Sequence, residues 1–302
     1  MNEISGVLYI NKPAGITSYG VVNIIRKNYN LTQVGHTGTL DPMATGVMVL
    51  LIGRAVKASE YIINKDKVYE SGLKLGIVTD TGDITGKVIN ETRGNIPELT
   101  PEKMTELAEM FTGGISQTPP MYSAKKINGR KLADLARKGI TIDREPQNVN
   151  IYELKISRAA DAEYSLYVHC SKGTYIRVLC EDIGAALGCG ATMTALKRIR
   201  SGSVNISECY DLRDIEAMEL KEKTGLLRPV DTLFDDLEAV ELPEFYSKLA
   251  GNGVEIYQEK INTNFPYGKM VKLYSNKTFF ALAQAREYEN GSALKPVKQF
   301  NI

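Results

Sequence analysis

The run VMVLLI at residues 47–52 constrains the fold most, because it is continuously apolar yet far too short to cross a bilayer. A strand with one exposed face alternates apolar and polar residues, and this run has no polar member. It therefore predicts a central strand buried on both faces. Further strand-like stretches lie at residues 7–10, 67–76, 148–158, 163–170 and 192–204.

Helical patterns fall between these strands without a regular β-α-β alternation. Thr100 followed by Pro101 is typical of a helix start, and Thr17 or Ser18 fits the N-cap of an earlier helix. The pattern predicts an α+β fold whose mixed, mainly antiparallel sheet is flanked by helices. The other helical stretches are residues 54–65, 173–188 and 211–223.

The sequence pattern changes near residues 235–240. Beyond this point the segments are short and strand-like, and turn sequences such as NG, NTNFPYG and SNK separate them. We therefore expect two units: a larger domain at residues 1–235 and a small all-β module at residues 240–302.

Composition excludes several function classes. The four cysteines form no C-x-x-C pair and His36 and His169 are the only imidazoles, so no metal site is expected. There is no P-loop, and no cofactor is predicted. The N-terminal residues lack the pattern of a signal peptide, which favours a soluble, cytoplasmic protein with no membrane partner.

Charge is balanced overall but clustered locally. The chain has 37 basic and 36 acidic residues, yet residues 125–138 carry six basic residues against one acid. Lys197, Arg198 and Arg200 form a second basic cluster. Such strips either bind a polyanion along their length or are solvated helix faces, and charge alone leaves both interpretations open.

The turn GHTGTLDPMATG at residues 35–46 contains a single carboxylate, Asp41. The following proline disfavours helical geometry at Asp41, and the flanking glycines allow a ligand to approach closely. The residue is either an ordinary Asp-Pro turn or a reactive acid. A partly dry carboxylate needs a cation to keep its pKa low, and Arg177 is the best candidate.

The motif GHTGTLDPMATGVM resembles the catalytic motif of the pseudouridine synthases, specifically the bacterial group that acts on uridine-55 of tRNA. Four more blocks match this family in its own order, and together they span nearly the whole chain. They are INKPAGITS (10–18), KVYESGLKLGIVTDTGDITG (67–86), QTPPMYSAKKINGRKL (117–132) and VHCSKGTYIRVLCEDIG (168–184). The resemblance implies a pseudouridine synthase catalytic domain, an RNA-gripping insertion at about 117–140 and a PUA-like RNA-binding module at the C-terminus.

The resemblance also implies roles for individual residues. Asp41 matches the catalytic aspartate, and Arg177 matches the arginine that pairs with it. Tyr69 matches a tyrosine that stacks on the target base and is a proposed proton acceptor at the ribose. No metal or organic cofactor is implied.

Substrate-binding residues follow from the same match. Leu196 occupies the place of an apolar pocket residue, and His36 matches a histidine that contacts the tRNA loop where the flipped base has left a gap. Lys12 and Pro13 match a pair that supports the active site. Further binding roles follow from side-chain chemistry: Tyr122 suits stacking on extruded bases, and the basic residues Lys125, Lys126 and Arg130 suit phosphate contacts.

The implied function is isomerisation of uridine to pseudouridine in the T-loop of tRNA by a monomer, with base flipping. The residues do not decide whether Asp41 attacks C1′ or C6, or assists removal of a proton from C2′. Three alternatives stay open: a tRNA-binding folding chaperone, a related synthase acting on another RNA with partner proteins, and a glycosidase with paired carboxylates. Asp80 and Asp83 are expected to shape a turn rather than form a second catalytic pair.

Overall fold

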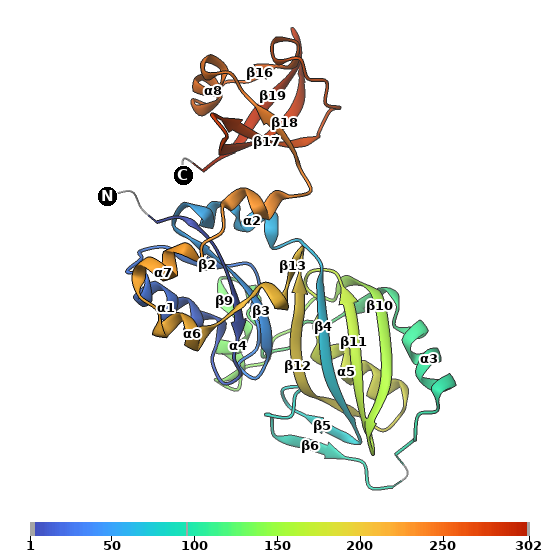
Figure 1. Cartoon of the computed structure of the whole chain (residues 1–302). Helices are drawn as coiled ribbons and strands as arrows, with labels where there is room; N and C mark the ends of the chain where they lie inside the picture. Colours follow the sequence, from blue (N-terminus) through green and yellow to red (C-terminus); the bar gives the residue numbers. More distant parts are fainter. Residues whose placement is uncertain (1–3, 95, 301–302) are drawn as a thin grey trace.

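The structure is a computed structural model that describes residues 4–94 and 96–300, and its two larger sheets differ in size (Figure 1). The larger sheet runs in the order β14-β1-β3-β12-β4-β11-β10-β7, with β13 paired to β12 and β2 to β3. Its strands are β1 (Gly6–Lys12), β2 (Val34–His36), β3 (Thr45–Ile52), β4 (Lys67–Leu75), β7 (Gly113–Gln117), β10 (Gln147–Ala160), β11 (Glu163–Cys170), β12 (Ala191–Ser201), β13 (Val204–Asn205) and β14 (Tyr210–Asp211).

Strand pairing in this sheet is mixed but mainly antiparallel. Among the pairs of the described residues, β3 with β12 and β1 with β14 are parallel, and the rest are antiparallel. The expected antiparallel pair of residues 148–158 and 163–170 is β10 with β11. The sheet type predicted from the sequence is therefore confirmed.

Strand β3 is buried on both faces, as its continuous apolar run predicts. Met48 and Leu50 pack in one hydrophobic cluster with helix α1 (Ser18–Asn28), whereas Val47 and Val49 pack in a second cluster on the opposite face. The N-cap of α1 is Thr17, whose hydroxyl accepts a hydrogen bond from the Gly20 amide at 2.9 Å. This strand leads directly out of the turn that carries Asp41.

Two longer helices cover the other half of the sheet. Helix α5 (Ile176–Ala186) packs in the cluster shared by β4, β11 and β12, and α3 (Pro101–Met110) lies against β10. Helix α3 begins after Thr100, which accepts a hydrogen bond from the Lys103 amide. A small hairpin, β5 (Ile77–Thr79) with β6 (Val88–Glu91), follows β4.

Two predicted helices differ from the structure. Residues 54–65 form a 3-10 stretch, η1 (Gly53–Ala58), and a short helix, α2 (Ser59–Ile62). The buried residues Ala55 and Ala58 are three apart, which suits the 3-10 period. Residues 211–223 form two helices, because Met218 adopts an extended conformation between α6 (Leu212–Ala217) and α7 (Leu220–Gly225).

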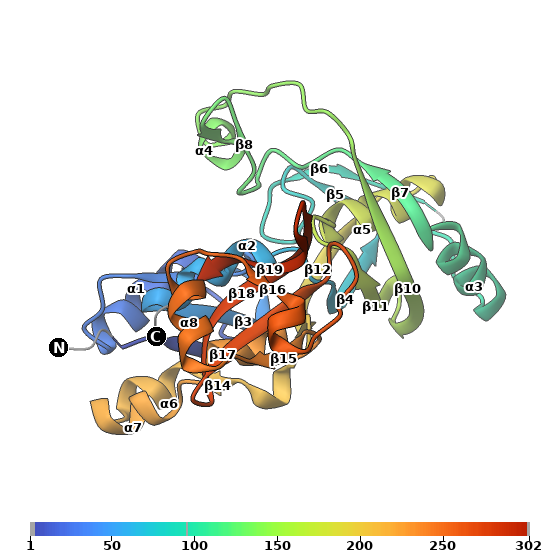
Figure 2. The ribbon, with the colours of Figure 1, turned by 90° about the horizontal axis from the view of Figure 1, so that it is seen from above.

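The predicted RNA-gripping segment connects β7 to β10 through long, largely irregular stretches (Figure 2). It carries a two-stranded ladder, β8 (Lys126–Ile127) with β9 (Arg130–Lys131), followed by helix α4 (Leu132–Ala136). We call residues 118–146 the insertion.

The C-terminal module is a five-stranded sheet in the order β15-β17-β18-β19-β16. It also contains helix α8 (Glu244–Gly251), although the sequence predicts an all-β module. The helix forms here because it packs Ala250 into the module's own core. The other elements of the module are β15 (Glu238–Glu241), β16 (Ile256–Tyr257), β17 (Met270–Ser275), β18 (Thr278–Tyr288), β19 (Gly291–Gln299) and η4 (Gln258–Ile261). Two 3-10 stretches precede the module: η2 (Ile206–Glu208) lies between β13 and β14 of the larger sheet, and η3 (Val230–Phe234) lies between α7 and β15.

The two sheets share part of their hydrophobic packing. Phe279, Leu282 and Phe300 of the module belong to the cluster that contains Val49 and Phe234. The module is therefore packed against the larger unit, and a domain boundary between residues 235 and 240 stays a prediction. Among the described residues, no helix is both long enough and apolar enough to span a bilayer.

Candidate active site

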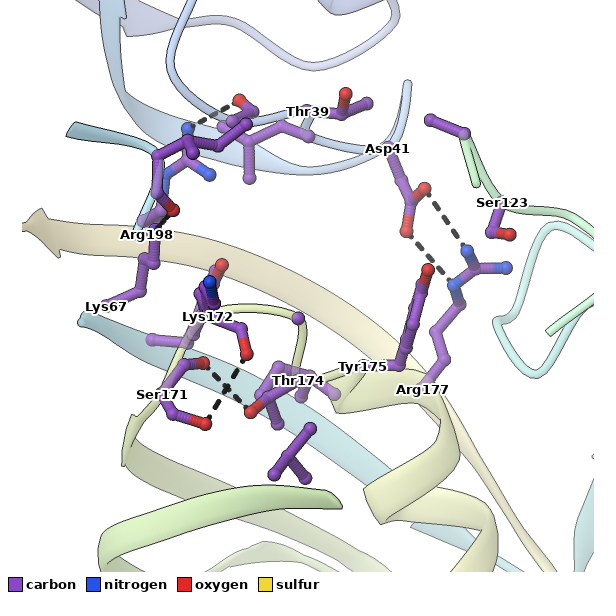
Figure 3. Close-up of a pocket in the computed structure, with 18 of the residues that line it drawn as sticks. Thr39, Asp41, Lys67, Ser123, Ser171, Lys172, Thr174, Tyr175, Arg177 and Arg198 are labelled. Atoms are coloured by element: carbon purple, nitrogen blue, oxygen red, sulfur yellow. Dashed lines mark hydrogen bonds and ion pairs between the residues drawn. The ribbon is translucent and has the colours of Figure 1, made fainter. Parts of the chain in front are cut away.

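A cavity of about 590 Å³ lies beside the turn that carries Asp41, and its size suits a nucleotide-sized ligand (Figure 3). Its lining comes from segments that are far apart in the sequence. They include Asp41 from the turn, Lys67 and Tyr69 from β4, Tyr175 and Arg177 at the start of α5, Leu196 and Arg198 from β12, and Ser123 from the insertion.

Asp41 and Arg177 form an ion pair in this cavity. Arg177 Nε lies 3.0 Å from Asp41 Oδ2, and Arg177 Nη2 donates to Asp41 Oδ1 at 3.3 Å. The same guanidinium donates to the Thr81 and Tyr122 carbonyl oxygens, each at 2.8 Å. Because all these contacts fix its plane, the arginine presents Asp41 in one orientation. The pairing expected from the sequence is present in the structure.

The pKa of Asp41 is raised, which differs from the expectation that Arg177 holds it down. Burial of the carboxyl raises the pKa more than the Arg177 cation lowers it, and the nearby Asp83 carboxylate raises it further. Lys12 opposes both effects from the other side of the turn. The site therefore holds one acid that is desolvated but ion-paired, which strengthens its electrostatic interaction with a bound ligand.

Lys12 fixes the turn from below and does not reach the cavity. Its side chain is fully buried, and Nζ donates to the carbonyl oxygens of Pro13 at 2.9 Å, Pro42 at 3.2 Å and Ala44 at 2.6 Å. Since an ammonium has three donors, none is left for a ligand. The structure thus gives Lys12 a supporting position, and Pro13 contributes a carbonyl to it, rather than a place in the substrate-binding set.

Two further buried side chains hold the same turn. The Ser18 hydroxyl accepts from the Leu40 amide at 2.8 Å and donates to the Leu40 carbonyl at 3.0 Å. Arg198 Nε donates to the Val47 carbonyl at 2.7 Å, and Nη2 to the Gly38 carbonyl at 3.1 Å. Position 46 requires a glycine, because φ there is +102° and a Cβ would lie 2.2 Å from the Arg198 carbonyl oxygen of β12.

Tyr69 and Leu196 both line the cavity, as the resemblance implies. Tyr69 is paired with Arg198 across the β4–β12 ladder. Burial raises the pKa of the Tyr69 phenol, although Arg198 opposes this, so the hydroxyl stays protonated at neutral pH. A neutral, flat ring in the same cavity as Asp41 suits stacking on a base. A protonated phenol is a poor proton acceptor, so the raised pKa does not favour the proton-acceptor role that the resemblance implies, and this role stays a prediction.

The other predicted binding residues lie around the cavity rather than in its lining. His36 is half-buried on β2, and its Nδ1 accepts a hydrogen bond from the Gly38 amide at 3.3 Å. Burial lowers the pKa of His36, and Arg198 lowers it further, so the ring is neutral at pH 7. In the insertion, Tyr122 reaches Arg177 through its carbonyl, Lys125 donates to Gln147, and Lys126 and Arg130 are exposed.

Several residues in or beside the cavity are absent from the catalytic and binding residues that the sequence predicts. Lys67 lines the cavity, and burial lowers its pKa to about 8. Gln117 fixes the start of α5, because its amide pairs with both the amide and the carbonyl of Tyr175. Asp83 accepts hydrogen bonds from Thr81 and Thr85, which makes it the turn-shaping residue that was expected. Arg198, which the sequence places in a basic cluster with Lys197 and Arg200, is buried and hydrogen-bonds the turn.

Comparison with known proteins places these features in a family. Residues 26–176 match the TruB family pseudouridylate synthase (N terminal domain), and residues 177–235 match the tRNA pseudouridylate synthase B C-terminal domain. The "tRNA pseudouridine synthase B" of Clostridium tetani (strain Massachusetts / E88) is 40% identical over 281 residues, 93% of this chain and 96% of that protein. The chain belongs to the TruB family of pseudouridylate synthases.

Other relatives agree with this assignment. The "tRNA pseudouridine synthase B" of Azoarcus sp. (strain BH72) is 45% identical over 239 residues, 79% of each chain. A solved chain from "Crystal Structure of a Cbf5-Nop10-Gar1 Complex" superposes with a TM-score of 0.72 at 24% identity, covering 98% of this chain and 84% of that one. This likeness confirms the α+β fold with its PUA-like C-terminal module. The chain is therefore an enzyme, a pseudouridine synthase that isomerises uridine in RNA.

Proposed function

We propose that the substrate is uridine 55 in the T-loop of tRNA, which the enzyme flips into the cavity and isomerises to pseudouridine. The observation that carries the proposal is the Asp41–Arg177 ion pair at the cavity wall, because it aims one desolvated carboxylate at the space a nucleoside would fill. The names of the relatives, tRNA pseudouridine synthase B, supply the RNA class.

The chemistry needs only groups that this chain supplies. The C1′–N1 bond breaks and its electron pair stays on the uracil; the base then turns, C5 bonds to C1′, the C5 proton leaves, and N1 gains a proton. A single carboxylate suits this reaction as a nucleophile or as a stabiliser of positive charge at C1′. Tyr69 would hold the detached base by stacking, with Leu196 beside it.

Access to the buried base has a cost that RNA contacts must offset. Unstacking a nucleotide costs roughly a few kcal/mol. The exposed cations Lys126 and Arg130 of the insertion would contact phosphates, with Lys125 and the ring of Tyr122 near the flipped nucleotides. His36, neutral and beside the turn, would fill the gap in the loop.

We propose a monomer that grips the T-arm between the insertion and the larger sheet, since residues of both line the cavity. We propose the cytoplasm as the compartment, because tRNA is made and used there.

The test is pseudouridine formation in an unmodified tRNA transcript, with wild type compared with Asp41→Asn in EDTA. We expect wild type to convert one uridine, at position 55, and a transcript with cytidine at this position to stay unmodified. Asp41→Asn should bind the transcript normally and lose at least about a thousandfold in rate, since the amide is a poor nucleophile and has no charge.

The same experiment separates the chaperone alternative. If both proteins bind tRNA and neither converts any uridine, the substrate assignment fails and RNA folding becomes the function to test. If wild type converts a uridine elsewhere, the chemistry stands and the proposed position is wrong.

A further inference from the structure

The cavity has a basic end, where the positive charges have no acid beside them in the lining. Among the residues that the structure describes, the charged lining residues are one acid, Asp41, and four cations: Lys67, Lys172, Arg177 and Arg198. Asp41 pairs with Arg177, and this pair is neutral overall. Lys67, Lys172 and Arg198 lie on the other side of the cavity (Figure 3). The two ends of the cavity therefore differ in charge.

The cations of the basic end act on one another. Burial lowers the pKa of Lys67 to about 8, and the nearby charges of Arg198 and Lys172 contribute to this shift. Asp66 opposes it from outside the cavity lining, but the Asp66 carboxylate already pairs with Arg200 at 3.1 Å. Like charges held together in a partly dry site repel one another, and a bound anion would relieve this repulsion.

The loop between α2 and β4 holds both lysines at the cavity wall and leaves hydrogen-bond donors on each. Lys67 Nζ donates to the Ile63 carbonyl at 3.0 Å and to the Lys65 carbonyl. Lys172 Nζ donates to Asn64 Oδ1 at 2.5 Å. An ammonium has three donors, so within the described residues Lys67 keeps one and Lys172 keeps two. The acceptors are neutral, so they compensate neither charge.

We propose that Lys67 and Lys172 form a phosphate subsite, which binds one of the two backbone phosphates attached to the target uridine. This inference rests on the proposed function. The two phosphates flank the ribose of the flipped nucleotide, so they follow it towards the cavity in which Asp41 acts. A phosphate is negatively charged and accepts several hydrogen bonds, which suits two ammonium groups with free donors. Arg198 adds positive charge, while its Nε and Nη2 donate to backbone carbonyls.

The subsite differs from the exposed cations of the insertion in its effect on the reaction. Lys126 and Arg130 are exposed and do not line the cavity. Lys67 is 6% exposed, and it lines the same cavity as Asp41. A phosphate held there fixes the ribose with respect to the carboxylate, so this contact contributes to the rate as well as to the affinity.

The first experiment compares wild type with Lys172→Gln and Asn64→Asp on the unmodified transcript. We expect Lys172→Gln to weaken tRNA binding by about five- to tenfold, to reduce the salt dependence of log Kd by about one ion contact and to lower kcat by about tenfold. Asn64→Asp should show similar losses, because its carboxylate would pair with Lys172 in place of the phosphate. If Lys172 served only to tie down the loop, this ion pair would keep the loop in place, and Asn64→Asp would bind tRNA as wild type does. Lys155→Gln, at an exposed lysine of β10 outside the cavity lining, is the control and should bind within about twofold of wild type.

The second experiment neutralises the phosphate instead of the lysine. Two synthetic tRNAs each carry one methylphosphonate, on the 5′ or the 3′ side of the target uridine, with 2′-O-methylation before the linkage to keep the chain intact. Reference tRNAs have the same 2′-O-methyl group and an ordinary phosphate. At one of the two linkages we expect wild type to lose about tenfold in affinity and Lys172→Gln to lose less than about twofold, since its contact is already absent. Lys67→Met, which keeps the apolar stem, should lose its response at the same linkage.

The outcomes distinguish the possible failures. Equal losses in wild type and Lys172→Gln at both linkages would overturn the subsite, and so would normal tRNA binding by Lys172→Gln or by Asn64→Asp. Inorganic phosphate that inhibits wild type but not Lys172→Gln, without coupling at either linkage, would assign the lysines to a free anion and also overturn it. A wild type that fails to convert uridine 55 would refute the proposed function, while the coupling in Kd would still test the phosphate contact.

Discussion

The two segments that meet at the ion pair are held in opposite ways. The turn of residues 35–46 is fixed by three buried polar side chains, Lys12, Ser18 and Arg198, which donate to carbonyl oxygens of the turn or of adjoining residues. The insertion is exposed over most of its length and is attached near the cavity through the Tyr122 carbonyl, which accepts from Arg177, and through Lys125, which donates to Gln147.

This difference separates two demands of the reaction. A carboxylate that acts on one atom must be held in one geometry, and buried hydrogen bonds with every donor satisfied provide that. A segment that admits a folded RNA needs fewer contacts with the rest of the protein, because it must move away to let the RNA in before it packs against the RNA. Arg177 joins the two, since one guanidinium contacts Asp41 of the turn and Tyr122 of the insertion.

The strongest test of the rigid turn is Lys12→Met. The variant keeps the apolar stem and leaves the three carbonyls without their donor, at roughly 1–3 kcal/mol for each buried group left unsatisfied. Part of this loss is offset, because burial has lowered the pKa of Lys12 to about 8 and the desolvated ammonium is also removed. We expect about 2 kcal/mol less stability in urea unfolding and about a hundredfold lower kcat from displacement of Asp41.

A matched control for this variant is Lys27→Met in the last turn of α1, where the lysine is exposed. It should change neither quantity beyond a few tenths of a kcal/mol, as is usual for surface substitutions. Normal kcat in Lys12→Met would mean that Ser18 and Arg198 suffice to hold the turn. The tighter hydrogen bonding of the turn, compared with the insertion, would then not be needed for catalysis.

The exposed insertion predicts the opposite phenotype. Removing both cations in Lys126→Ala/Arg130→Ala should weaken tRNA binding about tenfold and reduce the salt dependence of log Kd by about two ion contacts, with kcat at saturating tRNA unchanged. Binding titrations at several salt concentrations give both values. Lys103→Ala on α3, where the lysine is paired with Glu106, is the control. A fall in kcat instead of affinity would show that the insertion positions the substrate for chemistry.

The sequence predicted one kind of feature well. The two-sided burial of β3 follows from its uninterrupted apolar run, and the pairing of Asp41 with Arg177 follows from the need of a dry carboxylate for a cation. These depend on the character of the side chains themselves. The clamps on the turn are different, because their acceptors are backbone carbonyls 30, 22 and 151 residues away from Lys12, Ser18 and Arg198. Every residue has a carbonyl, so the sequence gives no sign of which one is used.

The smallest expected effect concerns how the turn's acid titrates. The pKa of Asp41 lies above the ordinary value of 3.8, since burial outweighs Arg177. A catalytic carboxylate must be ionised, so activity should fall as the pH drops through this raised pKa. Folding stability has the opposite sign: the folded state binds the proton more tightly than the unfolded chain, so ionisation of Asp41 destabilises the fold as the pH rises from 3.8 through the raised pKa.

Asp83→Asn tests the origin of this shift. The amide keeps an acceptor for the Thr85 amide but removes the charge that raises the pKa of Asp41, so the acidic limb of the kcat/KM profile should move to lower pH. Asp80→Asn is the matched control, because Asp80 accepts from the Lys87 amide in the same turn and does not act on Asp41. A limb that stays in place in Asp83→Asn would assign the raised pKa to burial alone. The raised pKa of Asp41 would then result entirely from its burial by the rigid turn.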